Sequence, residues 1–176
     1  MVFEGNNKVR RKIYQAIEGL TDDELNGKPK SGGWSPKQIL EHLTLMETYI
    51  AAKILEELKN PESERASKKI LLTGSRTAKV ELPEPTKPTE QYMNAAEIKE
   101  GLHNSRIYLL DVYESCSEEA LRNKSMVHPT IGPIPLIQWF PLIGIYEKCH
   151  LKQLRKTIDE LKMNGTATIT AGDFDS

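Results

Sequence analysis

Four long stretches of the chain repeat apolar residues at spacings of three and four, the pattern of amphipathic α-helices with one buried face. They cover about residues 6–20, 36–58, 95–116 and 136–163. The second has the clearest start, because Ser35 suits the N-cap, Pro36 the first helical position and Gln38 the capping box. No convincing pair of strands lies between the stretches, so we predict an all-α four-helix bundle.

The connections between these helices differ in length. Residues 61–93 contain four prolines and only a weak strand-like patch, at residues 79–82. They predict a long crossover between the second and third helices, either a plain surface linker or part of a binding site. Gly165 is expected to end the last helix. We therefore predict one domain, residues 1–163, and a flexible C-terminal tail, residues 164–176.

Charge and composition exclude several classes of function. With 24 basic and 25 acidic side chains the net charge is -1, so no nucleic-acid partner is expected. The basic run at residues 8–12 is interpreted as a solvated helix face. No apolar run reaches the roughly 18 residues of a bilayer span, the start lacks a secretory signal, and two cysteines make no disulfide framework. We expect a cytoplasmic protein without a membrane partner.

Two histidines fall on inward faces of the predicted helices. His42 lies beside the apolar stripe of the second helix, and His150 lies within that of the fourth. A single inward histidine is more often a hydrogen-bonded core residue, but two on facing helices are a natural site for a divalent transition metal. His128, in the turn-rich segment before the last helix, could approach the mouth of the bundle, whereas His103 is expected at the surface.

The neighbours of His150 leave alternatives open. Tyr146 lies one turn earlier on the same face, as a core aromatic whose hydroxyl bonds a histidine or as a third metal ligand. Glu147 and His150 have the Glu-x-x-His spacing of di-iron bundles, but Glu41 and Glu47 are predicted to face away from His42, which disfavours such a centre. Cys149 is interpreted as a plain half-buried thiol rather than a reactive one.

Four motifs stand out in the sequence: WSPKQILEHL at residues 34–43, HPTIG at 128–132, QWF at 138–140 and YEKCHLKQ at 146–153. Together they resemble the DinB-like superfamily, also called YfiT-like. The resemblance covers nearly the whole chain and implies a four-helix bundle that holds one Zn²⁺ or Ni²⁺ with three histidines. His42 and His150 match two of those positions, and Tyr146 occupies the third. Cys149 replaces an arginine that is common before the last histidine.

The resemblance implies a metal-dependent enzyme, a hydrolase or a thiol S-transferase, that acts on a small molecule such as a low-molecular-weight thiol. It also implies a homodimer, since members of the family are frequently dimeric. Two imidazoles and a phenol bind a divalent ion more weakly than three imidazoles do. The alternative is a degenerate, metal-poor bundle that serves as a non-catalytic binding or dimerisation module.

Overall fold

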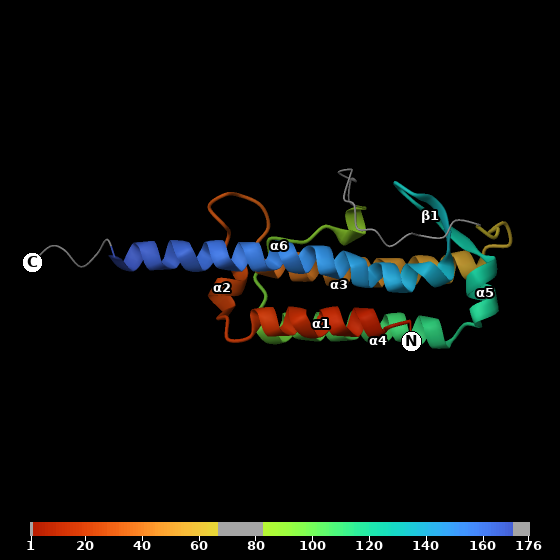
Figure 1. The fold of residues 1–176 in the computed structure, drawn as a ribbon, viewed down its shortest axis with the longest axis horizontal. Helices are drawn as coiled ribbons and strands as arrows, with labels where there is room; N and C mark the ends of the chain where they lie inside the picture. Colours follow the sequence, from red (N-terminus) through yellow and green to blue (C-terminus); the bar gives the residue numbers. More distant parts are fainter. Residues whose placement is uncertain (1, 67–82, 171–176) are drawn as a thin grey trace, which may run out of the picture.

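The computed structural model describes residues 2–66 and 83–170 of the chain. Four long helices pack along one another (Figure 1): α1 (Glu4–Ile17), α3 (Pro36–Lys59), α4 (Ala95–Glu114) and α6 (Leu136–Thr170). The shorter α2 (Asp22–Asn26), α5 (Glu118–Asn123) and the 3-10 turn η1 (Glu84–Thr86) connect them. The predicted all-α four-helix bundle is confirmed.

The long crossover follows from the direction of two neighbouring helices. Thr44 of α3 lies beside Gly101 of α4, and Glu47 of α3 accepts a hydrogen bond from Ser105 of α4. Contacts that advance together along both helices show that α3 and α4 are parallel, as Figure 1 also shows. The chain must therefore return along the bundle between them, because parallel neighbours cannot be joined by a tight turn. The strand-like patch at residues 79–82 lies outside the described residues.

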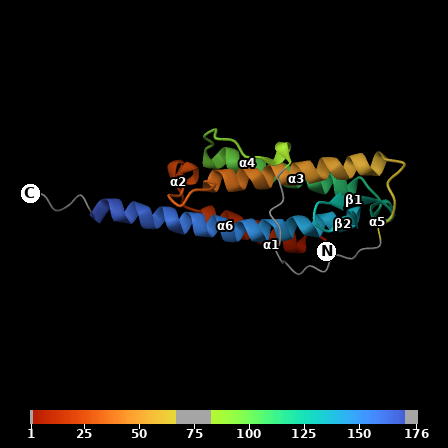
Figure 2. The ribbon, with the colours of Figure 1, turned by 90° about the horizontal axis from the view of Figure 1, so that it is seen from above.

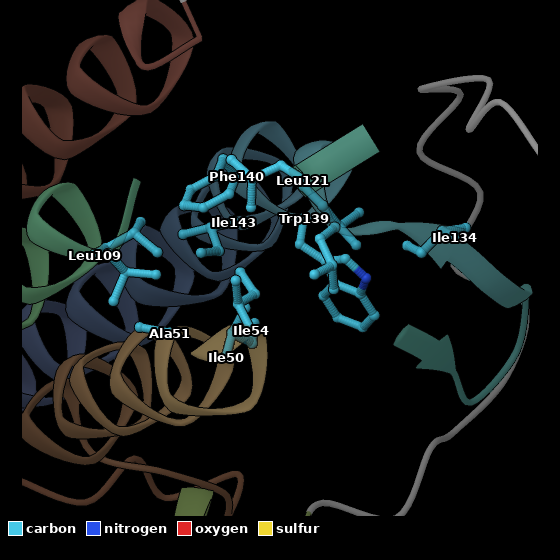
Figure 3. Close-up of a cluster of buried hydrophobic side chains, with 12 residues drawn as sticks. Ile50, Ala51, Ile54, Leu109, Leu121, Ile134, Trp139, Phe140 and Ile143 are labelled. Atoms are coloured by element: carbon cyan, nitrogen blue, oxygen red, sulfur yellow. The ribbon is translucent and has the colours of Figure 1, made fainter. Parts of the chain in front are cut away.

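Two apolar clusters fill the bundle, one toward each end. The cluster beside α5 gathers side chains of α3, α4 and α6 (Figure 3), among them Ile50, Ile54, Leu109, Phe140 and Ile143. The other cluster adds α1 to the same three helices, among them Ile13, Ile17, Leu43, Leu102 and Leu154. The predicted apolar stripes thus form the core.

Capping boxes begin three of the described helices, including the one that the sequence predicts at Ser35. Thr21, Ser35 and Asn94 each accept from the backbone N–H three residues later. Each third residue, a glutamate or glutamine, accepts in return from the backbone N–H of the cap. Two otherwise unpaired donors are satisfied at each start, which fixes where α2, α3 and α4 begin.

The segment before α6 forms a β-hairpin, which corrects the prediction that no strands pair. β1 (Ser125–His128) and β2 (Gly132–Pro135) are antiparallel, with Met126 opposite Ile134. The chain reverses over residues 129–131, and β2 begins at Gly132, whose φ of +87° suits glycine. The prolines that marked this segment as a turn are tolerated because each strand has only one partner.

The last helix continues past Gly165, so the prediction that it ends near residue 163 is wrong. α6 runs to Thr170 and extends beyond the other helices (Figure 2). Gly165 is exposed, and nothing lies within 4 Å of the place where its Cβ would be. A glycine inside a helix costs only about 1 kcal/mol and does not by itself end it. The rest of the predicted tail, residues 171–176, lies outside the described residues.

In the described part of the chain, no helix has both the length and the hydropathy that a bilayer span requires.

Candidate functional site

The structure brings His42 of α3 and His150 of α6 together inside the bundle, as the sequence predicts. The centres of their rings are 4.9 Å apart, and the ring planes meet at 51°. The two residues are 1% and 7% exposed. Trp34 covers His42 from the other side, with its ring centre 5.0 Å away. The paired imidazoles are therefore shielded from bulk water.

Hydrogen bonds to main-chain carbonyls orient both imidazoles in the same way. Nδ1 of His42 donates to the carbonyl of Thr86 at 2.7 Å, and Nδ1 of His150 donates to the carbonyl of Tyr146 at 2.9 Å. Burial lowers the pKa of His42, against the opposing effect of the bond to Thr86, so the neutral ring is favoured. In a neutral imidazole protonated at Nδ1, the lone pair is on Nε2. Nε2 is thus the nitrogen of His42 that could bind a metal, and the Nδ1 bond of His150 leaves Nε2 as its candidate ligand atom.

This arrangement fits two ligands of one divalent ion. Zn–N bonds of about 2.1 Å at a near-tetrahedral angle place two ring centres about 5 Å apart, close to the observed 4.9 Å. Metal-binding histidines usually donate the second ring N–H to a carbonyl or carboxylate, as both do here. His42 and His150 therefore have the spacing and the tautomers of metal ligands.

Tyr146 occupies the position of the third ligand, but its hydroxyl oxygen is 2.5 Å from Nε2 of His128. Burial raises the pKa of the phenol to about 12, with a further contribution from Cys149, which opposes formation of the phenolate that a metal would need. The geometry favours the interpretation of Tyr146 as an aromatic bonded to a histidine. Within the described ranges, no group of three or more His, Cys, Asp or Glu residues could hold a metal.

His128 reaches this site from the end of β1, as its place in the sequence suggested. It is buried, and its Nδ1 accepts from the backbone N–H of Thr130 at 3.2 Å. Its ring plane is within 8° of that of Tyr146, with centres 6.3 Å apart, so the hydrogen bond joins the two rings end to end. The His128 ring is tilted by 37° against Trp139, with centres 5.6 Å apart. The indole Nε1 of Trp139 is buried and has no acceptor in the described part of the chain.

A layer of four buried charges crosses the bundle next to the histidine pair. Each long helix contributes one charge: Arg10, Glu47, Arg106 and Glu147. Each arginine contacts both glutamates. Glu147 Oε1 is shared, 2.8 Å from Arg10 Nε and 3.1 Å from Arg106 Nη2, whereas Glu47 Oε1 is 2.6 Å from Arg106 Nε and Glu47 Oε2 is 2.9 Å from Arg10 Nη2. The layer is electrically neutral, and its carboxylates are bound to guanidinium groups, which excludes them as ligands of a di-iron centre.

The charge layer corrects the interpretation of the basic run at residues 8–12 as a solvated face. Arg10 is only 5% exposed, and the carboxylates of Glu147 and Glu47 raise the pKa of its guanidinium despite the opposing effect of burial. A signal was present in the sequence, because Arg10 lies three residues before buried Ile13. Glu47 does face away from His42, as predicted, but into the core rather than into solvent.

A second group that sequence reasoning missed fixes the segment that carries Thr86. Lys37 is 1% exposed, and its Nζ donates to Glu41 at 2.6 Å and to the carbonyl of Thr89 at 2.9 Å. Glu41 also accepts from the backbone N–H of Thr89 at 2.9 Å. These bonds fasten the chain after η1 to α3, which holds the Thr86 carbonyl against His42. A lysine in the first turn of a helix carries no sequence signal of such burial.

The other chemistry-bearing residues lie away from the histidine pair. Cys149 is half-buried and His103 is exposed, both as expected. The site therefore consists of two imidazoles from α3 and α6, with the hydrogen-bonded His128 and Tyr146 beside them. Together, fold and site define a four-helix-bundle protein with a candidate metal centre between its second and last long helices.

The model of the DinB superfamily matches residues 7–154, and the chain belongs to this family. It is similar to the uncharacterised protein YuaE of Bacillus subtilis, with 26% identity over 157 residues, 89% of this chain and 96% of that protein. Two solved structures share the fold. TT2238, described as a four-helix bundle protein, has a TM-score of 0.60 and 17% identity, covering 88% of this chain and 96% of that one. YfiT from Bacillus subtilis, described as a probable metal-dependent hydrolase with an unusual four-helix bundle topology, has a TM-score of 0.59 and 16% identity, covering 94% and 86%.

Proposed function

We propose that the protein is a metal-dependent enzyme of the DinB superfamily that binds one divalent transition metal, Zn²⁺ or Ni²⁺, through His42 and His150. The observation that carries the proposal is the pair of buried imidazoles 4.9 Å apart, each with Nδ1 bound to a carbonyl. The description of YfiT as a probable metal-dependent hydrolase supports the same class of chemistry.

The residues around the pair suit hydrolysis or thiol transfer on a small molecule. When bound, the ion would supply a Lewis acid that lowers the pKa of a thiol or a water. Trp34 and the Lys37–Thr89 contact shield the imidazoles and fix their orientation. The proposed substrate is a small molecule, a class that includes low-molecular-weight thiols. A homodimeric assembly and a cytoplasmic location are also part of this proposal.

A direct test is a Zn²⁺ titration of untagged, chelator-treated protein by calorimetry. We expect one ion per chain. His42→Ala and His150→Ala should each lower the affinity by more than the roughly 10- to 100-fold typical of losing an outer-shell partner, because each removes one of two imidazole ligands. The exposed His103 provides the matched control, since His103→Ala should leave the affinity unchanged.

The second candidate function is a metal-poor, non-catalytic binding or dimerisation module. It is favoured by Tyr146 at the third ligand position and by the lack of a three-residue donor cluster in the described part of the chain. The same titration separates the two. Native protein that binds no Zn²⁺, while Tyr146→His binds it tightly, would establish the module and refute the enzyme.

A further inference from the structure

The hydrogen bonds around His128 have a defined direction. The backbone N–H of Thr130 can only donate, so His128 Nδ1, 3.2 Å away, must accept. A neutral imidazole that accepts at Nδ1 carries its proton on Nε2. The contact between His128 Nε2 and the Tyr146 hydroxyl is therefore a bond in which the histidine donates and the phenol oxygen accepts.

This direction leaves the phenol proton of Tyr146 for another acceptor. A tyrosine hydroxyl donates one hydrogen bond and accepts others, and the bond from His128 uses only its accepting capacity. The residues that the structure describes supply no acceptor for that proton. The pKa of Tyr146 is raised to about 12 and that of His128 is lowered, both chiefly by burial, so both groups stay neutral near pH 7.

A second donor next to His128 also lacks an acceptor among the described residues. Trp139 packs against the His128 ring, with ring centres 5.6 Å apart, and is 5% exposed. Its buried indole N–H has no partner among the residues described. Leaving a buried donor unpaired is unfavourable, so such groups are normally satisfied by water or a ligand. Two unpaired donors around one histidine indicate a place for a ligand with acceptor atoms.

We propose that Tyr146 is a hydrogen-bond donor to an anionic ligand of the metal centre, set in place by His128, and is not itself a metal ligand. The inference rests on the proposed function, because the anion it recognises lies at the centre held by His42 and His150. The ligand class is a small anion or thiolate, which needs a donor to balance its charge in a buried site. His128 is a positioning residue, since it acts through Tyr146.

The first experiment needs no metal. In chelator-treated protein labelled with ¹⁵N-histidine, NMR should show His128 protonated at Nε2 and unprotonated at Nδ1. The opposite tautomer would overturn the inference whatever the protein does with metals.

The second experiment uses Co²⁺-loaded protein and azide, followed by visible absorption. Tyr146→Phe should bind Co²⁺ within about 3-fold of the native protein and should bind azide about 10- to 100-fold more weakly, the loss expected for one hydrogen bond to a charged group. His128→Leu should weaken azide binding in the same way. His128→Gln, which keeps an amide N–H near the position of Nε2, should restore it.

The outcomes distinguish the two proposals. If Tyr146→Phe loses Co²⁺ affinity by more than about 10-fold, Tyr146 is a ligand, and the donor role falls while the metal-dependent enzyme stands. Unchanged azide affinity in Tyr146→Phe also overturns the donor role. Native protein that takes up no Co²⁺ refutes the proposed function and, with it, the ligand assigned to Tyr146.

Discussion

Gly144 of α6 lies against Asn6 of α1, and Gly144→Ala should destabilise the bundle. A Cβ at this position would lie 2.5 Å from Oδ1, 3.0 Å from Cγ and 3.3 Å from Cα of Asn6. Asn6 is 1% exposed, and its Nδ2 donates to the carbonyl of Phe140 at 2.8 Å. The amide cannot move away from the new methyl group without losing this bond.

The magnitude follows from three effects. Alanine in place of a helical glycine gains about 1 kcal/mol. Breaking the bond from Asn6 leaves buried polar groups unpaired, at a cost of about 1–3 kcal/mol, and crowding the helix contact costs about 1–3 kcal/mol more. The costs exceed the gain, and we expect the free energy of unfolding to fall by about 1–5 kcal/mol.

Urea denaturation followed by circular dichroism measures this change, and Gly101→Ala is the matched control. Gly101 is also helical, but its Cβ would meet the side chain of Thr44 at 3.4 Å, an ordinary contact. Gly101→Ala should therefore be neutral or stabilise by up to about 1 kcal/mol. In an Asn6→Ala background, Gly144→Ala should lose most of its cost. Equal effects of the two glycine substitutions would refute the reasoning.

Three further predictions concern stability. Arg10→Met should lower the free energy of unfolding by about 3–5 kcal/mol, because it leaves buried carboxylates uncompensated. Arg11→Met, at an exposed position, should change the free energy of unfolding by less than about 0.5 kcal/mol. Similar urea midpoints for the two variants would contradict this prediction. Burial lowers the pKa of His128, so below about pH 6.5 the unfolded chain binds a proton that the folded chain does not. The contribution of neutral His128 to stability is therefore present above that pH and is lost as the pH falls. The native protein should lose more stability between pH 7.5 and 5.5 than His128→Gln does. Gly165→Ala should stabilise the protein by up to about 1 kcal/mol in thermal denaturation, since α6 passes through an uncrowded Gly165; a lower melting temperature would show that the glycine is needed there.

The sequence predicted most of the fold because the helical signals are local. Apolar spacing and the capping boxes at Ser35 and Asn94 act within one element, so they can be read without knowing what packs against it. The hairpin was missed because its two strands have only four residues each, and the second ends in Pro135, a residue usually found in turns. The continuation of α6 past Gly165 was missed because a weak helix former is not a stop signal.

The site was predictable only as far as helical periodicity reaches. His42 and His150 were found because their spacing places them on inward faces, and the structure confirms that they meet. The bond between His128 and Tyr146 depends on how the hairpin folds back over α6, and no local pattern encodes that contact. The burial of Arg10 depends on carboxylates from α3 and α6, which are 37 and 137 residues away.

The charge layer and the histidine pair both include residues of α6. This shared helix gives a role to the layer of buried charges, which the sequence did not predict. Glu147 lies between Tyr146 and His150 in sequence, but its carboxylate binds Arg10 and Arg106. The Tyr146 hydroxyl and Nδ1 of His150 bind other groups. Rotating α6, or sliding it by one turn, would turn His150 from His42 and would also bury Glu147 without its arginines, at a cost of several kcal/mol. Apolar contacts tolerate such shifts far better, because they lack direction. The layer therefore fixes the rotation and register of α6, and with them the direction in which its histidine points.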